Sequence, residues 1–245
     1  QKTDVITSAI GLQYGTDYGR GFYSDANAQL LYGTLLNNPN VDSFQKLSRL
    51  LQNPAPGQFS REVLKAATHL VSVVQRLAAT EAMNVTANSG HAESVVANQI
   101  DFASLFSKPQ VAYFHLPSSL GATSAAEIAR IALYSLLGSA RETPNTDRKQ
   151  VFVFIDEFQR IIANNLDLIL QTARSLRIGL ILANQSMSDL KKPGVDLTPS
   201  VRTNTRYKQV FAASNLEDMR DLVELSGEAL VHTRSFGEEG GALGG

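Results

Sequence analysis

The chain has 245 residues, of which 43% are hydrophobic, which is typical of a globular protein with one large domain or two smaller ones. Its formal charge is −1, from 22 Lys and Arg against 23 Asp and Glu, so no overall basic field indicates binding to nucleic acid or to an anionic membrane. Cysteine is absent, which excludes disulfides and thiolate metal sites and fits a reducing compartment.

The sequence shows no signal for membrane insertion. No apolar run approaches the roughly 18 residues of a bilayer-spanning helix, and the N-terminus lacks the basic-then-apolar pattern of a signal peptide. We therefore expect a soluble chain. Because it begins with Gln1 and ends in GEEGGALGG, we interpret it as a processed or partial chain with a flexible glycine-rich tail at residues 237–245.

Residues 1–105 are predicted to be a mostly helical region, an all-α domain. Three helices are expected there, each opened by a side chain that can accept a hydrogen bond from the first turn. Their ranges are 24–36, 43–51 and 60–79, with caps at Ser24 or Asp25, Ser43 and Ser60. The third has apolar residues at spacings of three and four, as on one face of a helix. The polar stretch at 80–94 is predicted to be a loop.

Residues 106–236 are predicted to be a second domain in which strands alternate with helices. The expected strands are 110–116, 149–155, 178–183 and 207–213; the expected helices are 124–141, 166–176 and 214–226, with a short helical start at 186–190. Ser-x-x-Glu capping boxes open the helices at 124 and 214. Continuous apolar strands separated by helices indicate a parallel sheet covered on both faces, so the predicted fold class is α/β.

Two carboxylates follow the second predicted strand in VFVFIDEFQRI, residues 151–161. Ligands of α/β nucleotide-binding sheets sit beyond the carboxyl ends of the strands, where Asp156 and Glu157 fall. Asp156 could hold Mg²⁺ through water, and Glu157 could orient or deprotonate the water that attacks a γ-phosphate. The alternative is that both acids only cap the next helix, as acidic residues at strand ends often do.

Two later features favour a nucleotide site. Arg174 and Arg177 precede the third strand, and an arginine there could bridge to a phosphate of its own site or of a neighbouring subunit's. The alternative is that a helix C-terminus simply attracts cations. Asn184 and Gln185 end that strand, and the Gln185 amide could donate to a γ-phosphate while accepting from the attacking water, or serve only as a structural hydrogen-bonding group. Together these residues favour a nucleoside triphosphatase core.

The phosphate-binding loop of such a core is absent from the sequence. No Gly-x-x-x-x-Gly-Lys-[Ser/Thr] occurs, and the glycine-rich YGTDYGRGFY at 14–23 lacks the lysine and follows no apolar strand, so it is interpreted as a turn-rich entry to the helical region. By itself the chain is expected neither to bind ATP tightly nor to hydrolyse it. If it belongs to an ATPase, it is the portion downstream of the P-loop.

The order of the segments resembles the type IV coupling proteins, TraG- and TraD-like, of conjugation and type IV secretion systems. The resemblance covers about residues 19–228 and is carried by VAYFHLPSSLGATSAAEIARIALYSLL, VFVFIDEFQRI, ARSLRIGLILANQSMSDL and NTRYKQVFAASNLEDMRDLVELSGE. It implies a RecA-like motor domain with an inserted all-α domain, on the cytoplasmic side of the bacterial inner membrane. It also implies a homo-hexamer that couples hydrolysis of ATP with Mg²⁺ to the movement of DNA or protein into the secretion channel.

The resemblance also implies roles for individual residues. Asp156 and Glu157 look like the Walker B pair, with Asp156 on the metal through water and Glu157 as the base. Gln185 looks like the glutamine of the following motif, in contact with nucleotide, and Arg174 looks like the arginine finger. Phe158 after the acidic pair resembles the coupling-protein form of the motif.

Other functions and partners stay open at this point. A HerA- or FtsK-like DNA translocase or a VirB4-like secretion ATPase would share the core, and a non-enzymatic alternative is an all-α module that docks relaxosome or effector proteins. A ring could enclose single-stranded DNA, with Lys191, Lys192, Arg202 and Arg206 as candidate contacts; the alternative is that these charges are merely solvated. The four histidines, at 69, 91, 115 and 232, show no metal-ligand spacing.

Overall fold

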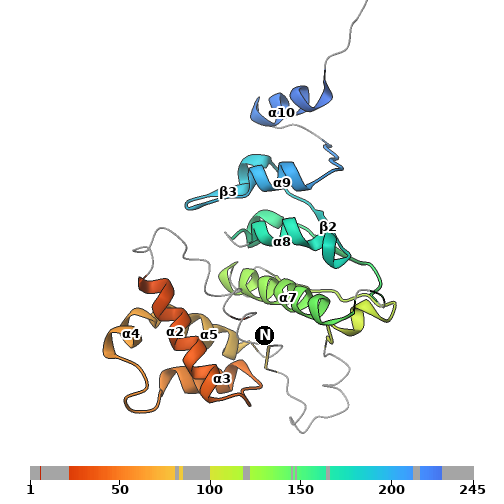
Figure 1. Cartoon of the computed structure of the whole chain (residues 1–245). Coiled ribbons are helices and arrows are strands. Elements are labelled where there is room, and N and C mark those ends of the chain that lie inside the picture. Colours follow the sequence, from red (N-terminus) through yellow and green to blue (C-terminus); the bar gives the residue numbers. More distant parts are fainter. Residues whose placement is uncertain are drawn as a thin grey trace, which may run out of the picture. The chain divides into compact units, whose positions relative to one another are not determined.

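The computed structural model describes residues 6, 22–80, 83–84, 100–117, 122–144, 146, 148–163, 166–211 and 216–227 (Figure 1). The chain divides into two compact units, Gln1–Lys208 and Gln209–Gly245. Most of the predicted loop at 80–94 and of the glycine-rich segment at 14–23 lies outside the described residues, as does the tail at 237–245. The predicted boundaries after residues 105 and 236 stay predictions.

The orange helices of Figure 1 form a helical cluster, which we define as α2 to α5. Their bounds are α2 (Phe22–Asn37), α3 (Phe44–Gln52), α4 (Arg61–Ala66) and α5 (Thr68–Ala79). Two predicted caps are confirmed: the Ser43 hydroxyl accepts from the backbone N–H of Lys46 at 3.3 Å, and that of Ser60 accepts from Val63 at 3.2 Å. Each satisfies a donor that the first turn of a helix leaves unpaired.

Two helix predictions in this cluster were wrong in detail. Helix α2 begins at Phe22, so Ser24 and Asp25 lie inside its first turn instead of capping it; Asp25 there still complements the positive end of the helix dipole. The single helix predicted for residues 60–79 bends at Ala67, a fully buried residue. The bend lets α4 pack against α2 while α5 packs against α3, so tertiary contacts override a continuous helical pattern.

Helix α7 (Ala122–Glu142) confirms the helix predicted at 124–141 and lies between two hydrophobic cores. Its Ile128 belongs to the core of the helical cluster, whereas Leu133 and Leu137 belong to the core beneath the strands. The predicted capping box at Ser124 and Glu127 is wrong, because the helix begins at Ala122 and position 127 faces the protein interior. α7 is therefore the element that both halves of the first unit share.

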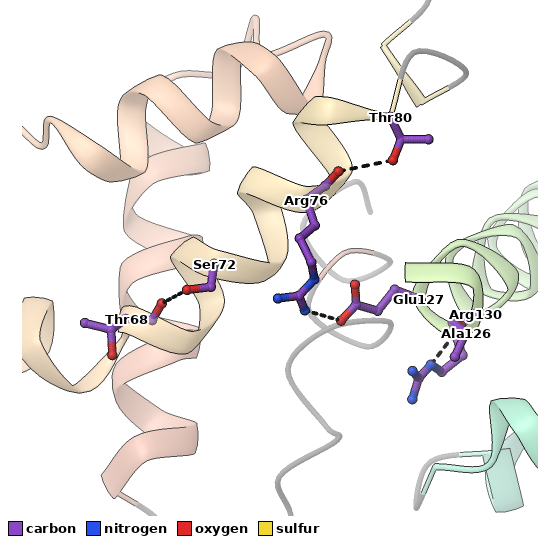
Figure 2. A network of polar contacts seen from close by, with 7 residues as sticks. All are labelled: Thr68, Ser72, Arg76, Thr80, Ala126, Glu127 and Arg130. Carbon is purple, nitrogen blue, oxygen red and sulfur yellow. Dashed lines mark hydrogen bonds and ion pairs between the residues drawn. The ribbon is translucent and has the colours of Figure 1, made fainter. Parts of the chain in front are cut away.

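An ion pair between a buried glutamate and a partly exposed arginine connects α7 to α5 (Figure 2). Glu127, whose side chain is fully buried, lies with Oε1 3.1 Å from an Nη of Arg76. Oε2 of Glu127 and Nε of Arg76 are buried and have no hydrogen-bond partner among the described residues. Burial raises the pKa of Glu127, and the nearby Arg76 only partly opposes that shift.

Two strands and the helices between them form a βαβ unit. Strands β1 (Val151–Ile155) and β2 (Ile178–Leu182) confirm the strands predicted at 149–155 and 178–183, and they pair in parallel from Val151↔Ile178 to Ile155↔Leu182. The connection contains η5 (Phe158–Ile161), α8 (Leu166–Thr172) and η6 (Ala173–Leu176). α8 and η6 together occupy the range of the single helix predicted at 166–176. These two parallel strands with helices between them are consistent with the predicted α/β class.

The two faces of this sheet differ in burial. Val151, Val153 and Ile155 alternate with Phe152 and Phe154 and pack against the core that α7 and α8 help to form. The side chains of Phe152 and Phe154 point to the other face and are 59% and 75% exposed. A strand alternates its side chains between two faces, so one face of β1 and β2 carries the core contacts.

The other two predicted strands were wrong within the described residues. The segment 110–116 is irregular, with Val111 95% and Tyr113 81% exposed, and residues 207–211 are irregular as well; positions 212 and 213 lie outside the described residues. A strand requires a neighbouring strand for its backbone hydrogen bonds, and in the described part of the chain neither segment pairs with β1 or β2. An apolar pattern alone was therefore not sufficient to predict a strand at either position.

The elements after β2 are short. They are η7 (Met187–Leu190), β3 (Lys191–Lys192), β4 (Val195–Asp196), α9 (Thr198–Asn204) and, in the second unit, α10 (Leu216–Ser226). The helical start predicted at 186–190 and the helix predicted at 214–226 are confirmed, although positions 214 and 215 of the second capping box are not described. The β3–β4 hairpin and α9 were missed, although Pro193 with Gly194 and Pro199 are ordinary signals of a turn and of a helix start.

No helix within the described ranges is both long and apolar enough to span a bilayer.

Candidate functional site

The end of β1 is tied to the end of β2 by backbone hydrogen bonds. The Ala183 N–H donates to the Ile155 carbonyl and the Phe158 N–H donates to the Ala183 carbonyl, both at 2.9 Å. Between these anchors the chain makes a tight turn in which Asp156 Oδ1 accepts from the Glu157 N–H at 2.9 Å. Both carboxylates therefore emerge at the carboxyl edge of the parallel pair.

Glu157 adopts an unusual backbone conformation in this turn. Its φ of 51° and ψ of 45° lie in the left-handed region, which a residue with a Cβ enters only at a cost of about 1–2 kcal/mol. Phe158, which is 2% exposed, follows and inserts into the core beneath the sheet. The strained turn thus separates a buried anchor from a side chain that is partly exposed at the sheet edge.

A hollow of about 310 Å³ lies at this edge. Its lining consists of Asp156, Glu157, Gln159, Ala183, Asn184 and Gln185. Three of the predicted site residues, Asp156, Glu157 and Gln185, therefore share one hollow, as expected for residues that follow adjacent parallel strands. Gln159 was not predicted, and Asn184 donates through Nδ2 to the Ser186 carbonyl at 2.7 Å, which stabilises the turn after β2.

The donor set of the hollow suits a hard cation with retained water. It offers two carboxylates and amide oxygens, whereas the described residues contain no cluster of three or more His, Cys, Asp or Glu that could enclose a metal ion. Mg²⁺ commonly binds through one or two carboxylates and keeps several waters for substrate oxygens. The residues present thus fit Mg²⁺, with Asp156 as the first candidate ligand.

The carboxylate of Glu157 is engaged by Arg160. Nε of Arg160 lies 2.6 Å from Glu157 Oε2, and an Nη donates to Oε1 at 3.1 Å. The guanidinium fork thus contacts both carboxylate oxygens across a spacing of three residues in η5. Arg160 was not among the predicted site residues; the signal for it was its position three residues after Glu157 in a short helical turn.

Arg174 and Arg177 lie away from the hollow. Both precede β2, whereas the hollow follows β2, and five strand residues span about 13–16 Å. Arg177, with φ of 57°, donates to the Arg148 carbonyl at 2.8 Å and so fixes the turn into β2. Arg174 is exposed in η6. The geometry does not support Arg174 acting on nucleotide in this same hollow, and its action on a neighbour's nucleotide stays a prediction.

The four candidate DNA contacts occupy two elements and a loop. Lys191 and Lys192 form β3, which pairs with β4 in an antiparallel hairpin. An ion pair joins the two strands, with Lys191 Nζ 3.9 Å from Asp196 Oδ2. Burial, and then the positive charge of Arg130, lower the pKa of Lys192. Arg202 lies in the last turn of α9.

Arg206 lies in the exposed loop after α9. The fold therefore places only Lys191 and Lys192 next to each other, and contact of any of the four with DNA stays a prediction.

Comparison with known protein families gives a match in the C-terminal part of the chain. Residues 150–244 match a family model described as the TraM recognition site of TraD and TraG. The matched range begins one residue before β1 and contains all the candidate site residues from Asp156 to Arg206. No curated protein and no solved structure matches the chain.

Proposed function

We propose that this chain is the cytoplasmic part of a type IV coupling-protein ATPase, because its residues 150–244 match the family described as the TraM recognition site of TraD and TraG. The observation that carries the ATPase proposal is the shared hollow in which Asp156, Glu157 and Gln185 follow adjacent parallel strands. In this proposal β1 and β2 belong to a RecA-like sheet. The full-length protein forms a hexamer that moves DNA or protein substrate to the secretion channel at the inner membrane.

The carboxylates divide two tasks in the proposed reaction. Asp156 would hold Mg²⁺ through water, and the bound ion would supply positive charge to offset the charge that develops on the phosphates. Glu157 orients the water that attacks the γ-phosphate and accepts its proton. The left-handed turn brings the Glu157 carboxylate to the edge of the hollow, while the Asp156 side chain stabilises that turn.

The amide of Gln185 and the guanidinium of Arg174 complete the proposal. Gln185 lies on the strand next to the carboxylates, where an amide can donate to a phosphate oxygen and accept from water. Arg174 is exposed on the side of β2 away from the hollow, which is compatible with a contact to the nucleotide of a neighbouring subunit. Such head-to-tail contacts close into rings, so an arginine finger and a hexamer support each other.

The base assignment can be tested in the full-length protein, including the segment upstream of Gln1 that we expect to hold the P-loop. Glu157→Gln should lower Mg²⁺-dependent ATP hydrolysis about 10²–10⁴-fold, the usual contribution of a general base. Glu62→Gln makes the same chemical change at an exposed position of α4 and should leave the rate unchanged. Full activity in Glu157→Gln would show that another residue is the base.

A second proposed function is recognition of a relaxosome protein, favoured by the description of the matching family. We propose that the chain binds a TraM-type relaxosome protein through residues 150–244, with the helical cluster as a second candidate docking region. We expect the whole chain to capture such a protein at low salt, because contacts between charged groups are strongest there. Absence of binding under that condition would contradict this function, and binding of single-stranded DNA alone would favour the motor.

One observation on the full-length sequence would distinguish a coupling protein from the related motors. The HerA-, FtsK- and VirB4-like alternatives share the strand-end residues, so the hollow does not discriminate among them. Membrane-spanning helices ahead of the P-loop in the full-length sequence would favour the coupling protein.

A further inference from the structure

The contact between Glu157 and Arg160 calls for an explanation other than stability. The side chains of Glu157 and Arg160 are 41% and 59% exposed, and partly exposed ion pairs contribute little to folding. Yet the pair has short bidentate geometry, with Nε 2.6 Å from Oε2 and Nη 3.1 Å from Oε1. A fork that contacts both oxygens fixes the plane of the carboxylate as well as its position.

The backbone of Glu157 is already fixed by its surroundings. Its N–H donates to Asp156 Oδ1 at 2.9 Å, its carbonyl accepts from the Arg160 N–H at 2.8 Å, and the next residue is bonded to Ala183. The side chain, in contrast, has three rotatable bonds and is partly exposed. Without a partner the carboxylate would sample several rotamers at the edge of the hollow.

Other arginines near the strands contact different groups. Arg148 and Arg177 direct their guanidinium groups to the backbone carbonyls of Leu176 and Arg148 at the opposite end of the strands, and so fix the fold there. Arg160 directs its fork to the one carboxylate that lines the hollow as the proposed base. The contrast indicates that Arg160 serves the site.

We propose that Arg160 is a positioning residue that holds the Glu157 carboxylate in the orientation needed for the attacking water. This inference rests on the proposed ATPase function. A carboxylate has about four lone-pair sites; the fork of Arg160 takes two, which leaves two for a water molecule. Arg160 itself does not line the hollow, so it acts through Glu157 and not on substrate.

The test uses ATP hydrolysis by the full-length protein with Arg160→Gln, Arg160→Lys and Arg141→Gln. Arg160→Gln should lower kcat about 10–100-fold with an unchanged KM for ATP, because a misplaced base affects the reaction and not binding. Arg160→Lys keeps the charge but loses the fork, so only part of the rate should return. Arg141→Gln removes an exposed arginine from the last turn of α7 and should have no effect.

A double variant tests whether Arg160 acts through Glu157. Glu157→Gln with Arg160→Gln should be no slower than Glu157→Gln alone, because the second change removes the positioning of a base that is already absent. Independent, multiplicative losses would overturn the positioning role. Equal melting temperatures of wild type and Arg160→Gln would exclude loss of fold as the cause; if Arg160→Gln is unstable, Arg160→Lys should still show a reduced kcat at unchanged KM.

The outcomes separate the two proposals. An unchanged or faster kcat in Arg160→Gln, with Glu157→Gln inactive, would overturn the positioning role alone, and a faster rate would show that the pair restrains the base. Full activity in Glu157→Gln would overturn both the assigned base and the role of Arg160.

Discussion

The helical cluster and the βαβ unit differ in what their sequences need from the rest of the chain. In the cluster, Ser43 and Ser60 cap helices within their own first turns, and side chains such as Leu70 and Val74 are almost completely buried. In the βαβ unit, β1 buries one face and leaves Phe152 and Phe154 exposed on the other. A helix satisfies its backbone internally, whereas a strand depends on neighbours that can be distant in sequence.

The largest effect is expected for the core of the helical cluster. Leu70 is 1% exposed, so Leu70→Ala should lower the free energy of unfolding by about 4 kcal/mol through lost burial and the cavity left behind. Leu36→Ala makes the same change in α2 at a side chain that is 66% exposed, and should cost less than about 0.5 kcal/mol. Urea unfolding measures both; equal costs would contradict the assigned core.

The ion pair between α5 of the helical cluster and α7 is expected to give the next largest effect. Arg76→Met leaves the buried Glu127 carboxylate without the guanidinium that it contacts and should cost about 3 kcal/mol at neutral pH. Arg76→Met combined with Glu127→Leu should return close to wild-type stability, because apolar replacement of a buried pair is often neutral. Loss of stability in the double variant would show that the pair provides more than charge compensation.

The same pair predicts a pH dependence with a definite sign. The pKa of Glu127 is raised above its usual 4.5, mainly by burial, and removing Arg76 takes away a cation that opposes the rise. The folded state therefore binds the proton more tightly than the unfolded state, and this contribution is complete below pH 4.5 and lost as pH rises through the folded-state pKa. Thermal unfolding of Arg76→Met should thus show a smaller deficit in acid than at pH 7. When both chains carry Glu127→Leu, the cost of adding Arg76→Met should not depend on pH.

A smaller effect tests how local the helical signals are. Ser43→Ala removes the side-chain acceptor for the Lys46 N–H and should destabilise the chain by about 1 kcal/mol. Ser72→Ala, inside α5, should be neutral or slightly stabilising because alanine has the higher helix propensity. A neutral result for Ser43→Ala in urea unfolding would mean that tertiary contacts and not the cap define the start of α3.

The smallest effect is expected on the exposed face of the sheet. Phe154 is 75% exposed, so Phe154→Ala should change the free energy of unfolding of this chain by less than about 0.5 kcal/mol. Ile178→Ala, at a buried position of β2, should cost about 2–4 kcal/mol in the same urea titration. If Phe154→Ala lowered the free energy of unfolding by more than about 2 kcal/mol, the face of β1 that carries Phe154 would be covered. The sheet would then not differ from the helical cluster in burial.

The comparison also explains which predictions failed. The helices at 43–51 and 124–141 and the strands at 149–155 and 178–183 carry strong local patterns, and each is present. The segments 110–116 and 207–211 carry apolar residues as well, yet remain irregular in the described part of the chain, because pairing decides whether an extended segment becomes a strand. The bend at Ala67 likewise depends on which helices α4 and α5 pack against.

In the candidate site as well, some residues could be predicted from the sequence and others only from the tertiary structure. The order of residues in the chain was sufficient to nominate Asp156, Glu157 and Gln185, because parallel strands bring their carboxyl ends to one edge. The sequence also carried the family resemblance, which the match over residues 150–244 supports. Only the tertiary structure showed that Arg160 contacts both oxygens of Glu157 and that Glu127 is buried against Arg76. The physical reason is that spacing along a strand or helix is set by covalent geometry, whereas side-chain partners depend on backbone conformation and packing that no short segment specifies.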